Sequence, residues 1–239
     1  MTQPQDRRRF LQSLGLSAAA LAAGACGSEG PKQAERLLSY AERKNAALER
    51  RLVRHTAMDH GSPGAAIAGD AFPSYHISDV VPVWDVAARG IWRLEIGGMV
   101  AKPMSLTLDD LMRLPRRTHR VNHFCVEGWN AVAEFSGVTI RELAALVRPD
   151  PAVTAVDFQS FDDGYHESWD LESALHPQTM VVYGKDGTPL SPAYGAPARV
   201  HGPIKLGYKN TKYLTRIDFL PTANGGYWSD AGYEWFGGT

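Results

Sequence analysis

The chain has 239 residues, of which 44% are apolar and 21% charged, and its 25 Lys and Arg against 26 Asp and Glu give a formal net charge of −1. This balance argues against nucleic acid as a partner, because a nucleic-acid binder needs a concentrated basic face to neutralise phosphates. After a predicted leader is removed, about 200 residues remain, enough for one domain with a full hydrophobic core.

The N-terminus has the pattern of an export signal. Residues 7–11 read RRRFL, which matches the twin-arginine pattern R-R-x-F-L, and an apolar run over 14–25 follows. That run is shorter than the ~20 apolar residues that a membrane-spanning helix needs. The alternative is a basic tail in front of a core helix, but the order of the parts favours a signal peptide over residues 1–25. Because the twin-arginine route carries folded proteins, often with a cofactor, we expect a bound cofactor and a periplasmic or other extracytoplasmic location.

The chain has two cysteines, Cys26 and Cys125. Residues 23–26 read AGAC, which fits either a signal-peptidase A-x-A site or a loose lipobox in which Cys26 is acylated. We favour acylation, which would anchor the protein at a membrane face without a spanning helix. Cys125 is then the only thiol of the mature domain. An unpaired thiol kept in an oxidising compartment is either inert and buried or retained for its chemistry.

A tether and an amphipathic helix are predicted over residues 26–71. Between Gln33 and Arg54, apolar residues recur at steps of three and four with charges between them, and they are Leu37, Leu38, Ala41, Leu48 and Leu52. This period is that of an amphipathic helix. The helix should end before the GSPG sequence at 61–64, which breaks regular structure.

The remainder, residues 72–239, is predicted to be one α+β domain. Short helices are expected after Thr107, a suitable N-cap, and over 139–147 with Leu143, Leu146 and Val147 facing inward. A turn is expected at Gly97 and Gly98. The predicted strands cover 92–96, 119–126, 153–161, 180–183, 198–201 and 214–220. Strands interrupted by short helices and Gly/Pro turns indicate an irregular mixed α/β domain, not a regular βαβ wind.

Cys125 lies in the sequence VNHFCVEGW at 121–129. If this is a strand, His123, Cys125 and Glu127 share one face, because side chains alternate along a strand. Three interpretations remain open from these residues alone. Cys125 could be a small buried apolar residue, part of a His/Cys/Glu metal site, or a nucleophile with His as its base. The second lacks the further ligands that zinc requires, and oxidation opposes the third.

Five segments together resemble a known family. They read WRLEIGGMVAKPMSLTLDDL from residue 92, HFCVEGW from 123, GAPAR from 195, IKLGYKNTKYLTRIDFL from 204 and GGYWSDAGYEWFGG from 225. As a set they resemble the molybdopterin-binding domain of sulfite-oxidase-type oxidoreductases. Within that family they are similar to the branch that contains the catalytic subunit of periplasmic protein-methionine-sulfoxide reductase. The resemblance implies the family's fold, a single irregular mixed α/β domain.

The resemblance also implies a cofactor and its site. Cys125 matches the cysteine that ligates molybdenum, with one molybdenum–molybdopterin cofactor per chain, and a soft thiolate suits such a metal. The positions that match cofactor-binding residues are His76, Ser160, Arg199, Lys209, Asn210, Thr211 and Lys212. A planar guanidinium such as that of Arg199 suits bidentate capture of the phosphate or of ring atoms of the cofactor. Tyr194 stands where the branch usually has Asn, so the sequence departs from the pattern of the branch at this contact.

The activity that the resemblance implies is two-electron oxygen-atom transfer at molybdenum, in which the protein orients the reactants. We expect reduction of an S- or N-oxide, either as a small molecule or bound to a protein. No C-x-x-C-H motif attaches haem c, so we expect a separate electron-transfer partner, a membrane haem protein or a cytochrome. The family's extra dimerising β-sandwich has no counterpart, so we expect a monomer. The alternatives are oxidation of sulfite or another small anion, and a metal-free binding domain with the same fold.

Overall fold

The computed structural model describes residues 34–52 and 73–239. The chain separates into two compact units, 1–47 and 48–239. The predicted helix between Gln33 and Arg54 is present as α2 (Ala34–Leu52). The predicted signal peptide over 1–25, and the tether apart from this helix, lie outside the described residues. No helix in the described ranges is both long and apolar enough to cross a membrane.

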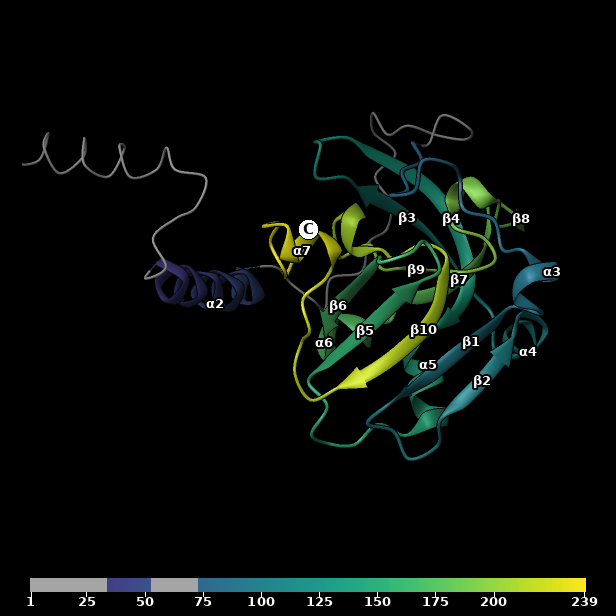
Figure 1. Ribbon diagram of the computed structural model, residues 1–239, viewed down its shortest axis with the longest axis horizontal. Helices are drawn as coiled ribbons and strands as arrows, with labels where there is room; N and C mark the ends of the chain where they lie inside the picture. The colour runs from purple at the N-terminus through teal and green to yellow at the C-terminus, as the bar shows by residue number, and fades with distance from the viewer. Residues whose placement is uncertain (1–33, 53–72) are drawn as a thin grey trace, which may run out of the picture. The chain divides into compact units, whose positions relative to one another are not determined.

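Two five-stranded sheets form the domain (Figure 1). The first has the order β2–β1–β10–β5–β6, in which β1 and β10 run parallel and the other neighbours antiparallel. The second has the order β3–β4–β7–β8, with β9 beside β7, and all its pairs are antiparallel. Strands of each sheet come from distant parts of the chain, so the architecture is α+β, as predicted.

The strands of the first sheet are β1 (Arg93–Gly98), β2 (Met104–Thr107), β5 (Ala155–Ser160), β6 (His166–Asp170) and β10 (Leu214–Leu220). Those of the second are β3 (Arg117–Phe124), β4 (Asn130–Thr139), β7 (Met180–Lys185), β8 (Thr188–Pro189) and β9 (Arg199–His201). The helices are α3 (Val86–Arg89), α4 (Leu108–Arg113), α5 (Ile140–Val147), α6 (Leu171–Ala174) and α7 (Tyr227–Asp230). Two single turns of 3-10 helix, η2 (Pro192–Tyr194) and η3 (Gly207–Lys209), lie in the loops around β9.

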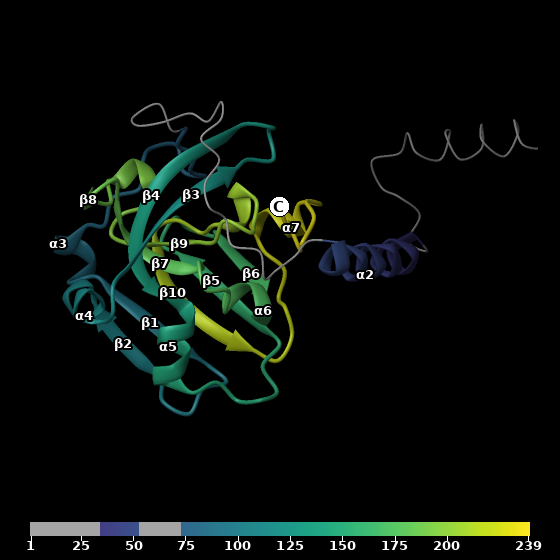
Figure 2. The ribbon, with the colours of Figure 1, turned by 180° about the vertical axis from the view of Figure 1, so that it is seen from behind.

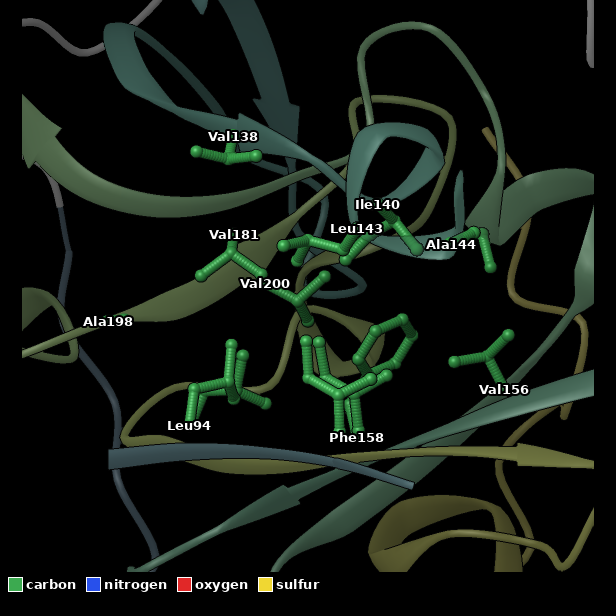
Figure 3. Packing of buried hydrophobic residues seen from close by; sticks show 14 of the residues in the cluster. Leu94, Val138, Ile140, Leu143, Ala144, Val156, Phe158, Val181, Ala198 and Val200 are labelled. Atoms are coloured by element: carbon green, nitrogen blue, oxygen red, sulfur yellow. The ribbon is translucent and has the colours of Figure 1, made fainter. Parts of the chain in front are cut away.

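Apolar side chains from both sheets form the main core between them. Leu94 on β1 and Phe158 on β5 are fully buried and point toward Val181 on β7 and Val200 on β9 (Figure 3). Helix α5 packs into the same core, and in the view from behind it lies in front of the first sheet (Figure 2). Burying a side chain the size of Leu or Phe stabilises the fold by about 1.5–3 kcal/mol, so this layer holds the two sheets together.

Both predicted helices begin at a threonine. The amide of Asp110 donates to Thr107 Oγ1 (3.1 Å), and Thr139 forms the same capping box with Glu142. The N-cap prediction for Thr107 is therefore confirmed.

On α5, Leu143 and Val147 are buried as predicted, but Leu146 is 40% exposed and the prediction for it was wrong. The buried stripe follows positions 140, 143, 144 and 147, which is the 3.6-residue period.

Gly97 and Gly98 were expected to form a turn, but both belong to β1 and pair with Asp218 and Phe219 of β10. Gly98 has φ +78°, and a Cβ there would lie 2.3 Å from the carbonyl oxygen of Phe219. Gly98, the last residue of β1, therefore permits a close approach between two strands and still belongs to the first of them.

Candidate active site

Cys125 lies at the tip of the β3–β4 hairpin. Strand β3 ends at Phe124, one residue earlier, and not at Val126 as predicted. The amide of Cys125 donates to the carbonyl of Trp129 (2.9 Å), and the amide of Gly128 donates to the carbonyl of Cys125 (3.0 Å). Gly128 has φ +87°, a left-handed conformation that glycine adopts without strain. The chain therefore reverses direction at the cysteine.

This turn also changes the relation between the three residues that were predicted to share a strand face. His123 is buried on β3, Cys125 is half-buried in the turn, and Glu127 is exposed. The common strand face was therefore a wrong prediction. All three nevertheless border one cavity of about 280 Å³. Within the described ranges, no group of three or more His, Cys, Asp or Glu is placed to hold a metal ion.

The cavity wall comes from five parts of the chain, 73–77, 123–129, 160–165, 194–213 and 228–233. These parts are loops, turns, strand ends and the short helices η3 and α7, and the two sheets hold them in place. A concave site of this size with a few convergent polar groups is typical of a small-molecule site.

Cys125 carries a free thiol in this wall. Burial raises the pKa of the Cys125 thiol, the backbone amides of Glu127 and Val126 lower it by donating to the sulfur, and the charge of Glu127 raises it. The net direction is upward, so the protein itself does not supply the positive charge that would stabilise a thiolate. A bound metal ion would supply that charge.

Glu127 is fixed at the cavity beside this sulfur. Its Oε2 accepts hydrogen bonds from the hydroxyl of Tyr75 (2.9 Å) and the indole Nε1 of Trp129 (3.1 Å). The rings of Tyr75 and Trp129 stack, with centroids 6.3 Å apart. The carboxylate is therefore held in a defined orientation.

His76 and Ser160 lie in the wall, as the resemblance implied. Within the described part of the chain, the buried Nδ1 of His76 has no hydrogen-bond partner. The hydroxyl of Ser160 accepts from the amide of Asp162 (2.8 Å), and Asp162 Oδ2 accepts from the amide of Ile77 (3.0 Å). Asp162 thus fastens the segment that carries His76 to the end of β5.

Arg199 is a buried cation in the same wall, 3% exposed. Its Nη2 donates to the carbonyl of Asn210 (3.1 Å), and its Nη1 donates to the carbonyl of Tyr194 (3.3 Å). Burial lowers the pKa of Arg199 to about 10. No carboxylate among the described residues forms an ion pair with it.

Lys212 is a second cation at this end of the cavity. Its Nζ donates to the carbonyl of Ala193 (2.9 Å) and to the hydroxyl of Ser74 (3.2 Å). Burial and then the charge of Arg199 lower the pKa of Lys212 to about 7, while Asp162 opposes them. Like Arg199, it forms no ion pair with any carboxylate that the structure describes.

The other three residues of the predicted loop serve the fold. Lys209 is not in the wall, because its ammonium forms a buried ion pair with Glu167 (2.5 Å). Asn210 reaches the wall, but its side-chain oxygen accepts from the amide of Gly202 (2.7 Å) and its side-chain nitrogen donates to the carbonyls of residues 205 and 206. Thr211 is buried and lies outside the wall. The cavity thus brings together Cys125 with the predicted His76, Ser160, Arg199, Asn210 and Lys212, but not Lys209 or Thr211.

Sequence reasoning missed the aromatic part of the wall. Tyr208, Trp228 and Tyr233 line the cavity and contact one another, with centroids 5.4 Å apart for Tyr208 and Tyr233 and 5.1 Å apart for Trp228 and Tyr233. The signal was present, because the tail GYWSDAGYEWF is dense in aromatic residues.

His123 and His201 form a buried pair, with Nδ1 of the first 3.3 Å from Nε2 of the second. Burial lowers the pKa of His123 to about 3 and that of His201 well below its ordinary value. Both rings are therefore neutral at physiological pH.

The sequence matches the family described as the oxidoreductase molybdopterin binding domain, over residues 80–228. The chain belongs to this family. A family relative from Azospira oryzae, provisionally assigned as the protein-methionine-sulfoxide reductase subunit YedZ1, is 37% identical over 98% of this chain and 88% of its own. The protein-methionine-sulfoxide reductase catalytic subunit MsrP of Xanthomonas axonopodis pv. citri is 27% identical over 95% of this chain and 73% of its own.

The fold of the family is also found in a solved structure. The sulfane dehydrogenase SoxCD from Paracoccus pantotrophus matches with a TM-score of 0.54 and 22% identity. The match covers 71% of this chain but only 46% of that chain. This likeness concerns the fold alone. The family match and the relatives identify the chain as a molybdopterin oxidoreductase of the sulfite-oxidase-like family, and the solved structure confirms the predicted fold class.

The cavity fits the group that the family name specifies. Molybdopterin is a pterin that carries a phosphate. Arg199, which is buried, and Lys212, which is partly buried, offer positive charge that no described carboxylate neutralises. The free thiol of Cys125 suits a soft, sulfur-bound metal. The unpartnered Nδ1 of His76 is free to bond the ligand.

Proposed function

We propose that the chain is a molybdenum enzyme that reduces S-oxides, with methionine sulfoxide as the first substrate to test, and that N-oxides are secondary substrates. One observation carries the proposal. A free thiol, the buried guanidinium of Arg199 and the partly buried ammonium of Lys212 border the same cavity, and no described carboxylate pairs with either cation. The cofactor, one per chain, would supply two-electron oxygen-atom transfer when bound.

The chain's residues would hold the cofactor at both ends. Cys125 would bind the metal through its sulfur, and its turn, closed by two backbone hydrogen bonds, fixes the position of that sulfur. Arg199 and Lys212 would hold the phosphate, since each is already oriented by carbonyl oxygens. His76 would donate to or accept from the cofactor at Nδ1.

The charge near Cys125 favours a neutral oxide over sulfite. Arg199 and Lys212 are the only Lys or Arg among the described wall residues, and in this proposal the phosphate occupies them. The charge that remains beside the sulfur is the carboxylate of Glu127, which would repel an anionic substrate. The aromatic side chains of the wall suit a thioether-like group, since sulfur packs well against aromatic rings.

We further propose where the enzyme works and what reduces it. Residues 1–25 would direct export by the twin-arginine route to the periplasm, and Cys26 would be acylated at the membrane face. Relatives are named as subunits or catalytic subunits, which supports a separate partner. We propose that this partner is a haem protein that delivers electrons one at a time.

The first test is metal and pterin analysis of the exported protein. We expect about one molybdenum and one pterin per chain in the wild type. Cys125→Ser should keep the fold but lose the molybdenum. The matched control is Cys26→Ser, which removes the other cysteine and should keep the metal. Wild-type molybdenum content and turnover in Cys125→Ser would overturn the assignment of the ligand, and a wild type without molybdenum would overturn the proposed function.

The second test is turnover with a reduced dye. We expect reduction of methionine sulfoxide, free or in a peptide, to exceed reduction of N-oxides, and sulfite oxidation to be negligible. Sulfite oxidation that exceeds sulfoxide reduction would reverse the assignment.

A further inference from the structure

Tyr213 is a cavity residue with no role so far. It lies in the wall next to Lys212 and is 1% exposed. Its hydroxyl oxygen is buried, and no side chain or backbone group of the described residues forms a hydrogen bond with it. Leaving a buried hydroxyl without a partner is unfavourable, so the position calls for a bonding partner that the protein does not supply.

The backbone holds this tyrosine in an uncommon conformation. Tyr213 has φ +57°, in the left-handed region that bulky residues rarely adopt. Its amide donates to the carbonyl of Gly195 (3.3 Å), and its carbonyl accepts from the amide of Phe161 (2.9 Å). Strained conformations of this kind cluster at ligand sites. These two backbone hydrogen bonds thus hold the Tyr213 ring in a position that an unstrained backbone would not give it.

The surroundings of the ring are those of the cationic end of the cavity. Lys212 Nζ lies 5.6 Å from the ring centroid, and the Phe161 ring meets it edge-on at 5.4 Å. Burial and then the charge of Asp162 raise the pKa of Tyr213 to about 12, although Arg199 opposes them. The hydroxyl therefore stays protonated and can donate a hydrogen bond at physiological pH.

We propose that the Tyr213 hydroxyl is a third donor, beside Arg199 and Lys212, to the phosphate of the molybdopterin cofactor. The inference rests on the proposed function, which places the phosphate at these two cations. A neutral donor adds a directed hydrogen bond to a site where two positive charges already attract the anion. Hydrogen bonds to charged groups are among the stronger ones in proteins.

The test compares two Tyr→Phe variants that delete equivalent atoms. Tyr183 is also buried, and its hydroxyl has no hydrogen-bond partner among the described residues. It belongs to the core between the sheets and not to the cavity wall. If neither hydroxyl bonded a ligand, both deletions would be neutral or slightly stabilising. The loaded full-length protein is incubated in mild denaturant, and released pterin is followed by its fluorescence while retained molybdenum is measured in the protein.

We expect Tyr213→Phe to release pterin about tenfold faster than the wild type, equivalent to about 1.4 kcal/mol, and to melt at a lower temperature when loaded. Tyr183→Phe should match the wild type in both measurements. Equal release from Tyr213→Phe and the wild type, with normal loading, would overturn this inference and leave the proposed function standing. A wild type that contains no pterin would overturn the proposed function and this inference with it.

Discussion

The buried ion pair between Lys209 and Glu167 should be a main support of the cavity, and Lys209→Met tests this. Both side chains are 0% exposed, and their charged atoms are 2.5 Å apart. Glu167 also accepts from the amide of Trp228 (3.0 Å) and the hydroxyl of Ser229 (3.2 Å) in the tail. Through Glu167 on β6, the pair therefore joins η3, which carries Lys209, to the aromatic tail.

Removing one partner of a buried pair leaves an uncompensated charge and costs about 3–5 kcal/mol. For a domain of this size, each kcal/mol shifts the melting temperature by roughly 2–4 °C. Lys209→Met should therefore lower Tm by roughly 6–20 °C. Met has a similar length, so the loss would come from the stranded Glu167 carboxylate and not from a cavity. Because a buried pair can often be replaced by neutral groups at little cost, the double variant Lys209→Met/Glu167→Gln should recover much of the loss.

The assay is thermal unfolding of the full-length protein, followed by circular dichroism. The control is Arg113→Gln, which removes an exposed pair with Asp110, whose side chains are 75% and 38% exposed. Such surface pairs contribute about 0–1 kcal/mol. A melting temperature for Lys209→Met within 2 °C of that for Arg113→Gln, taking ~2–4 °C per kcal/mol, would refute the reasoning.

Three further predictions concern the fold. Gly137→Ala should destabilise by more than about 2 kcal/mol in urea unfolding, because a Cβ there would lie 1.9 Å from the carbonyl oxygen of Val181; an unchanged midpoint would contradict this. Leu143→Ala should cost about 2–5 kcal/mol and Leu146→Ala less than about 0.5, since only the first is buried; equal losses would contradict the assigned face. Burial raises the pKa of Asp170, but its lysine partner and nearby donors bring it below its ordinary 3.8. A carboxyl whose pKa is lower in the folded than in the unfolded protein stabilises the fold at pH values above its unfolded pKa. This stabilisation is lost as the pH falls through its folded pKa. Stability should therefore drop below about pH 4, less steeply in Asp170→Asn, and equal slopes would contradict this.

Local signals that involve neighbours in sequence were predictable. Thr107 and Thr139 precede acids at the third following position, and both helices begin there. Strand β10 was predicted with its observed bounds. Strand β6 was missed, because its sequence HESWD is polar although four of its five residues are buried. Its carboxylates are buried against lysines far along the chain, which no local pattern reveals.

Site residues could be predicted where they belong to a sequence motif. The prediction failed for residues whose position depends on tertiary contacts. Cys125 and Arg199 could be predicted as cavity residues because their segments resemble those of the family. Lys209 and Lys212 looked equivalent in sequence, but the first faces a buried acid and the second faces the cavity. Tyr213 offered no signal at all, since its role depends on a hydroxyl that is unpartnered only once the fold has closed around it.

The distribution of charge along residues 199–212 is the strongest physical argument for an anionic, metal-containing ligand. Lys205 and Lys209 are buried opposite Asp170 and Glu167, so their charges are balanced within the protein. Arg199 and Lys212 lie on the same stretch and have only carbonyl and hydroxyl partners among the described residues.

An isolated buried cation is costly. Asp162, whose charge acts on Lys212, is already engaged by the segment that carries His76. In the same wall, the thiol of Cys125 has the opposite deficit, because burial disfavours its anion and no cation is among the described groups that act on its pKa. A ligand with a phosphate at one end and a sulfur-bound metal at the other would satisfy both deficits at once.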